Sequence, residues 1–141
     1  MFRCNMSICR TLIFFTFISC CSCTKKANDE EVTIEEFGEK VKLNDSVLAY
    51  MPQGKYSLGK EGRLSKVDVF LYYDVNNNGT WQMFGGPFPC VVTESTWRYS
   101  KGVIPNCALG RRYRSEVKLY CTNTRKTKEF LIATTTREFT Y

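Results

Sequence analysis

The chain has 141 residues, a formal net charge of +6 at pH 7, eight cysteines and no histidine. Without histidine it cannot build a Ser-His or Cys-His catalytic pair, and a histidine-ligated metal site is excluded too. No glycine-rich phosphate-binding motif occurs, so we expect a protein that is not an enzyme and that holds no metal or cofactor.

A short apolar run lies near the amino terminus, behind two positive charges. Arg3 and Arg10 supply the charge, and the run covers residues 11–18 and ends just before Ser19. This order of charge, apolar centre and small residue is typical of a secretory signal peptide. The run is well short of the roughly 20 residues that span a bilayer. We therefore expect residues 1–19 to be a cleaved leader.

The motif Phe17-Ile18-Ser19-Cys20 resembles the lipobox of bacterial lipoproteins. In that family the cysteine thiol is thioether-linked to a diacylglycerol and the new terminal amine is acylated, which gives enough acyl chains for stable anchoring. The resemblance implies that Cys20 is the lipid anchor and that the bilayer is a partner. Cys21 and Cys23 stay open as alternative anchors, because Phe17 replaces the usual leucine.

Residues 20–31 are polar, charged and without periodicity, which predicts a flexible tether. Within them, Asp29-Glu30-Glu31 is similar to the acidic signal that Bacteroidota lipoproteins carry after the cysteine to reach the outer leaflet. The resemblance implies a location at the outer membrane or the cell surface. A simple solvated charge cluster is the alternative, and the choice of leaflet stays open.

The remaining residues, 32–141, are enough for one domain with a real core, and they favour β-strands. The clearest strand covers residues 66–75, where apolar side chains recur at every second position. An Asn-Gly pair then predicts a hairpin turn at residues 76–79, before a strand at 80–84. Further strands are predicted at 32–43, 47–51, 91–93, 117–122 and 127–136.

With no helical stripe in the domain, these short strands predict a small all-β antiparallel sandwich. An immunoglobulin-like arrangement is one form that such a sandwich takes, and a small open barrel is the alternative. Gly85-Gly86-Pro87 predicts a turn.

The segment Asp74 to Gly79 matches the first half of a calcium-binding loop, with oxygen-bearing side chains at positions 1, 3 and 5 before the glycine. Position 12, where a bidentate glutamate is expected, is Gly85. A hairpin turn explains the same residues, so we expect no calcium site.

Three cysteines lie in the domain, and export would place them where disulfides persist. We expect a bridge between Cys90 and Cys107. Cys121 shares a strand face with Val117 and Leu119, which predicts a buried small side chain. The odd number leaves one thiol unpaired unless Cys21 or Cys23 takes part.

Residues 98–128 carry nine basic side chains and one acidic one, a local charge of +8. Aromatic residues are interleaved with them, and such a segment favours an anionic ligand. Solvated strand faces, with lysine and arginine protecting edge strands, are the alternative. Because the protein is expected to be exported, we predict no nucleic-acid partner. The predicted ligand surface consists of Trp97, Tyr99, Arg111, Arg112, Tyr113 and Arg114.

Two functions follow from these observations. The first is an interaction or structural role in the cell envelope, with envelope proteins as partners. The alternative is a module that binds a glycan or another anionic ligand, using Trp81 or Trp97 as a stacking platform beside the basic segment. Exposure of the tryptophans beside polar groups favours the glycan, whereas burial of both favours the interaction role.

Overall fold

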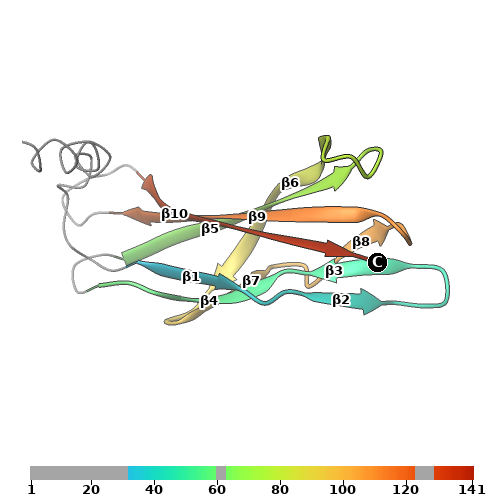
Figure 1. Ribbon diagram of the computed structural model, residues 1–141. Coiled ribbons are helices and arrows are strands. Elements are labelled where there is room, and N and C mark those ends of the chain that lie inside the picture. Colours follow the sequence, from blue (N-terminus) through green and yellow to red (C-terminus); the bar gives the residue numbers. More distant parts are fainter. Residues whose placement is uncertain (1–31, 60–62, 123–128) are drawn as a thin grey trace, which may run out of the picture.

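The computed structural model describes residues 32–59, 63–122 and 129–141 (Figure 1). The predicted leader and tether, and the basic residues Arg125, Lys126 and Lys128, lie outside these ranges. No helix long and apolar enough to cross a membrane occurs within them. The described residues form ten strands: β1 Thr33–Glu36, β2 Glu39–Lys42, β3 Leu48–Met51, β4 Gln53–Ser57, β5 Arg63–Asp74, β6 Trp81–Val92, β7 Thr96–Tyr99, β8 Ile104–Cys107, β9 Arg112–Thr122 and β10 Glu129–Thr140.

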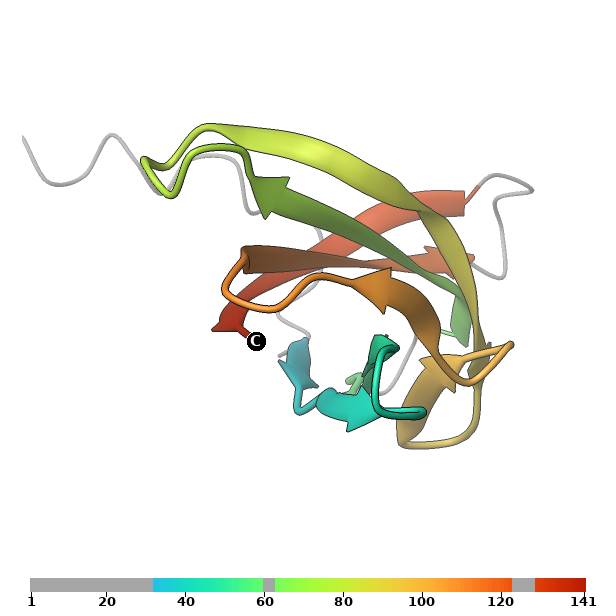
Figure 2. The same cartoon turned by 90° about the vertical axis from the view of Figure 1, so that its right-hand side faces the viewer.

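The all-β antiparallel prediction is confirmed. Seven of the described strands form one sheet in the order β1-β4-β7-β6-β5-β9-β10, and three form a second in the order β2-β3-β8. The two edges of the larger sheet, β1 and β10, contact each other, so the sheet curls into a nearly closed barrel-like sandwich (Figure 2). This division differs from the four and three strands of an immunoglobulin constant domain.

The core follows from period-two alternation on the long strands. Val67, Val69 and Leu71 of β5 are fully buried, and each contributes roughly 1.5–3 kcal/mol to folding. On β9 every second residue from Tyr113 to Cys121 is buried, as predicted for Cys121. These strands therefore have an inner face and an outer face.

The predicted turn at Gly85-Gly86-Pro87 is wrong, because these residues lie inside β6. The pairing of β6 with β5 shifts register between Val69 and Leu71, and Gly86 has φ +133°. A side chain at Gly86 would lie 3.0 Å from the Val69 carbonyl oxygen. The glycine therefore allows an irregularity that bends the strand, so that its first part pairs with β5 and its last three residues pair with β7.

The two ends of the barrel differ. At one end, here called the base, Thr33 pairs with Ser57, and Thr122 pairs with both Arg63 and Glu129. Val32, the first described residue, lies at the base. The opposite end, the tip, carries the β2–β3, β5–β6 and β8–β9 connections (Figure 1). The described part of the chain therefore begins at the base.

Candidate functional site

The structure corrects the predicted ligand surface. Trp97, Tyr99 and Tyr113 are core side chains with exposed fractions of 1%, 8% and 0%. They point inward because they alternate with basic residues along β7 and β9, and the two kinds of side chain occupy opposite faces of a strand. Arg112 and Arg114 accordingly lie on the outer face, away from the aromatic residues that were expected to join them.

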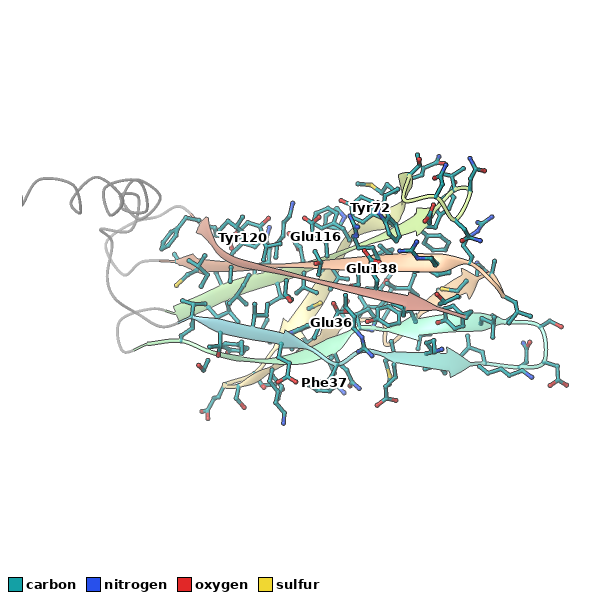
Figure 3. All side chains as sticks on the ribbon, viewed as in Figure 1. Glu36, Phe37, Tyr72, Glu116, Tyr120 and Glu138 are labelled. Carbon is teal, nitrogen blue, oxygen red and sulfur yellow. The ribbon has the colours of Figure 1, made fainter. Side chains whose placement is uncertain are left out.

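The outer face is formed by outward side chains of β5, β9, β10 and the start of β6. Tyr72, Glu116 and Tyr120 lie along this side of the sheet in Figure 3. Aromatic rings and cations contact each other along it: Lys66 Nζ lies 4.5 Å from the Tyr120 ring centroid, and Lys118 Nζ lies 4.9 Å from that of Phe70. These neighbours come from adjacent strands, so the contacts depend on how β5 pairs with β9.

Basic residues of the outer face are paired with carboxylates from the same strand or a neighbouring one. The ion pairs are Lys66–Asp68 (3.0 Å), Lys118–Glu116 (2.8 Å), Arg112–Asp74 (3.2 Å), Arg112–Glu138 (2.8 Å) and Arg114–Glu138 (2.7 Å). Acids on β5 and β10 thus offset much of the positive charge counted along β9. The outer face is not a free cationic surface.

Trp81, the first residue of β6, is a partly buried aromatic residue of this face and lies next to the β5–β6 connection. The guanidinium carbons of Arg112 and Arg114 lie 5.4 and 4.2 Å from its ring centroid. Such cation–π contacts are worth about 0.5–1 kcal/mol at exposed sites. The neighbouring Met83 side chain is 51% exposed.

Glu138 holds both guanidiniums in place. Its Oε1 accepts hydrogen bonds from Arg114 Nε at 3.1 Å and Nη2 at 2.7 Å, and its Oε2 accepts one from Arg112 Nη2 at 2.8 Å. Hydrogen bonds from Arg114, and then from Arg112, hold the pKa of Glu138 below its ordinary value. We call Trp81, Arg112, Arg114 and Glu138 the Trp81 ledge: one indole, two guanidiniums and one ionised carboxylate in fixed orientation.

Asp74 fixes the loop beside the ledge. Its carboxylate accepts hydrogen bonds from the backbone N–H of Asn78 (3.0 Å) and Gly79 (2.9 Å) and from Arg112 Nη1 (3.2 Å). Burial alone would raise the pKa of Asp74, but these donors hold it below its ordinary value. The loop connects β5 and β6 as a hairpin, although Asn77 and Gly79, rather than Asn78 and Gly79, have positive φ. No cluster of metal-ligating side chains occurs among the described residues.

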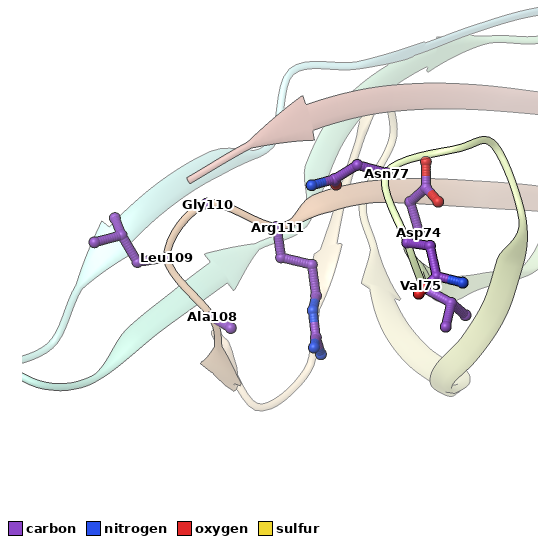
Figure 4. Close-up of a pocket in the computed structure, with 8 residues that line it drawn as sticks. Asp74, Val75, Asn77, Ala108, Leu109, Gly110 and Arg111 are labelled. Carbon is purple, nitrogen blue, oxygen red and sulfur yellow. The ribbon is translucent and has the colours of Figure 1, made fainter.

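A hollow of about 320 Å³ opens at the tip between the β5–β6 and β8–β9 connections (Figure 4). It is lined by residues 74–77 and 108–111. Val75 and Leu109 are 40% and 82% exposed, and the Leu109 side chain points away from the hollow in Figure 4. Arg111 from the predicted ligand surface also lines the hollow, apart from the Trp81 ledge. Asp74 lines the hollow too, and it accepts a hydrogen bond from Arg112 of the ledge.

The predicted disulfide between Cys90 and Cys107 is absent, because both are free thiols. Cys90 packs against the core cluster around Val67, whereas Cys107 belongs to the separate cluster around Tyr50. Burial raises the pKa of Cys90 to about 12 and also raises that of Cys107. Neither is therefore a thiolate at neutral pH, the form that a nucleophile requires.

Comparison with known proteins finds a weak structural likeness. No family model matches the chain, and no curated protein matches it. The solved structure of the bromine derivative of BhCBM56 is 14% identical, with 78% of this chain and 98% of that chain covered, at a TM-score of 0.33. That likeness is too low to transfer a function.

Proposed function

We propose that this chain is a lipid-anchored protein of the cell envelope whose β domain binds a glycan and catalyses no reaction. The observation that carries the proposal is the Trp81 ledge. A sugar presents C–H groups that pack on an indole, and hydroxyls that bond to planar charged groups. Glu138 orients both arginines before a ligand arrives, so little order is lost on binding.

The charges of the ledge favour contact with a neutral part of the glycan. Arg112 and Arg114 are offset by Asp74 and Glu138, so attraction of net charge contributes little at this position. Binding at the ledge is therefore expected to depend only weakly on salt, because screening acts mainly on unpaired exposed charges.

The orientation of the domain supports the same proposal. A lipid at Cys20 and a tether through residue 31 would approach the domain at Val32, on the base. The ledge includes Trp81, next to the β5–β6 connection at the tip. It would then lie away from the bilayer, where an extracellular or surface glycan can reach it.

The state of the titratable groups supports a role without catalysis. The pKa values of Asp74 and Glu138 are both lowered, so these carboxyls are ionised and unsuited to donate a proton at neutral pH. The thiols of Cys90 and Cys107 have raised pKa values. At these four residues, the states favour recognition over proton donation or nucleophilic attack.

Docking of an envelope protein is the second candidate, favoured by one observation. Leu43, Val75 and Leu109 lie on three different tip connections and are 49%, 40% and 82% exposed. Loop-borne apolar side chains of this kind often contact proteins. They lie outside the Trp81 ledge, so mutations in the ledge separate the two candidates.

Retention of the full chain by immobilised or gel-embedded polysaccharides tests the proposal. Trp81→Ala is expected to weaken binding of the retained glycan by roughly tenfold or more, equivalent to about 1.4 kcal/mol. Tyr120→Ala is the matched control, because it removes another partly buried aromatic ring of the outer face near the base. Equal binding by wild type and Trp81→Ala would contradict the proposal, as would retention by none of the polysaccharides.

The anchor is tested separately by metabolic labelling with a palmitate analogue. The wild type is expected to take up the label, and Cys20→Ala to lose it and move to the soluble fraction. Unchanged labelling of Cys20→Ala would transfer the anchor to another cysteine, with Cys23 the next to test.

A further inference from the structure

Arg111 differs from its two neighbouring arginines in having no acidic partner. Arg112 and Arg114 are ion-paired, whereas within the described ranges no carboxylate lies at ion-pair distance from Arg111. Its guanidinium carbon instead lies 4.7 Å from the centroid of the Tyr73 ring. Stacking of this kind restrains a guanidinium, and a further hydrogen bond joins Arg111 to the Tyr113 hydroxyl, so its remaining N–H groups are available to a planar anion.

The carboxylate nearest to Arg111 along the hollow does not compensate its charge. Asp74 already accepts two backbone N–H groups and Arg112 Nη1. Those contacts engage both of its carboxylate oxygens, although Asp74 itself lines the hollow. The hollow therefore retains one uncompensated positive charge, fixed against an aromatic ring.

The other lining groups suit a sugar. Asn76 and Asn77 are exposed and present side-chain amides that can bond to hydroxyls. Val75 adds a small apolar surface for C–H groups. Known small-molecule sites occupy about 300–1,000 Å³, and a hollow of about 320 Å³ falls at the lower end of that range, which fits a single small ring.

We propose that this hollow is a subsite for the carboxylate of an acidic sugar, with Arg111 as the anion-binding group and Asn76 and Asn77 as hydroxyl partners. The proposal rests on glycan binding as the proposed function and extends it. The hollow adjoins the ledge, because Asp74 lines the hollow and accepts a hydrogen bond from Arg112 of the ledge. A glycan with neutral and acidic sugars can therefore contact both sites.

The test is a titration of the full chain with glucuronate and galacturonate, followed by the backbone amide resonances of residues 108–111. The methyl esters of the same sugars are the matched neutral ligands. The acids are expected to shift these resonances saturably, and less at high salt, while the esters have little effect. Arg111→Gln should abolish the response. Arg98→Gln, which removes an equal charge at an exposed position on β7, should preserve it.

Equal responses to acids and esters would overturn the subsite, as would an unchanged response in Arg111→Gln. Tighter binding of N-acetyl-leucine than of either uronate would also overturn it, since this would indicate a site for a peptide carboxyl terminus. Polysaccharide retention that depends on Trp81 is measured independently. If polysaccharides retain the wild type through Trp81 but the uronates shift no resonances, only the subsite is rejected. If no polysaccharide retains the wild type, the proposed function is rejected.

Discussion

Arg114 on β9 and Glu138 on β10 are opposite each other on neighbouring strands. Arg114 Nε and Nη2 both donate hydrogen bonds to Glu138 Oε1, at 3.1 and 2.7 Å. The two residues are 24 positions apart in the sequence. The carboxylate that offsets Arg114 therefore comes from outside the basic segment 98–128. A charge count along the chain overstates the positive surface for this reason.

Replacing Glu138 should reduce stability mainly above acid pH. The pKa of Glu138 is lowered in the folded domain, so its contribution is present above the unfolded pKa and is lost as pH falls through the folded one. Glu138→Gln is expected to lower the urea midpoint slightly at pH 7 and by a smaller amount at pH 3. Glu129→Gln is the control, since its 3.7 Å pair with Lys66 has similar exposure. Equal effects of both changes at pH 7 would contradict this.

Glu36 should have the opposite pH dependence. Tyr50 donates a 2.5 Å hydrogen bond to its Oε1 inside the barrel, while its Oε2 has no partner among the described residues. Burial raises the pKa of Glu36 more than the Tyr50 hydrogen bond lowers it. The stability it contributes is therefore complete below the unfolded pKa and is lost as pH rises through the folded value.

Glu36→Gln keeps an acceptor for Tyr50 but cannot ionise. We expect its urea midpoint to fall less than that of wild type between pH 5 and pH 8. Glu35→Gln, an exposed change on the same strand, should keep the wild-type slope. A variant of Glu36 that loses more stability than wild type as pH rises would show that the buried carboxylate is better accommodated in its charged form.

Two glycines should respond differently to alanine. At Gly54 a Cβ would lie 2.1 Å from the Glu35 carbonyl oxygen and 2.4 Å from Trp97 Cζ2, whereas at Gly79, with φ +87°, it would meet open space. Gly54→Ala is expected to cost about 3 kcal/mol of unfolding free energy through overpacking. Gly79→Ala should cost about 1–2 kcal/mol through its left-handed backbone alone. Urea unfolding measures both, and a larger loss at Gly79 would be inconsistent with these contacts.

Calcium should not bind at Asp74. Its two carboxylate oxygens already accept hydrogen bonds from Asn78, Gly79 and Arg112, and position 12 of the motif is Gly85. Calorimetry of the full chain with millimolar calcium is expected to show only dilution heat. A single-site isotherm that disappears in Asp74→Asn would contradict this prediction.

Strands β5 and β9 were predictable because their patterns are local, whereas β6 was predicted as two strands separated by a turn. Alternation in β5 and β9 identifies their inner faces from the sequence. The same alternation in Trp97-Arg98-Tyr99, and around Tyr113, separates aromatic from basic side chains, a signal that the predicted ligand surface overlooked. The short strands β4 and β8 lack such a pattern.

The Trp81 ledge was not predictable as a unit. Trp81 was recognised as a stacking candidate, but its contacts with Arg112 and Arg114 depend on the pairing of β5 with β6 and β9. The role of Glu138 depends in addition on the register between β9 and β10. These registers are set by contacts between distant segments, and no local spacing in the sequence records them.

The most direct measurement uses Trp81 as its own reporter. The chain has two tryptophans, and Trp97→Phe leaves the indole of Trp81 alone without breaking a hydrogen bond, because Trp97 Nε1 has no partner in the described structure. During titration with a retained glycan, the emission of Trp81 is predicted to move to shorter wavelength and to become protected from iodide quenching, with the same midpoint as binding. Binding that saturates while the emission and quenching of Trp81 stay constant would contradict the ledge as the glycan site.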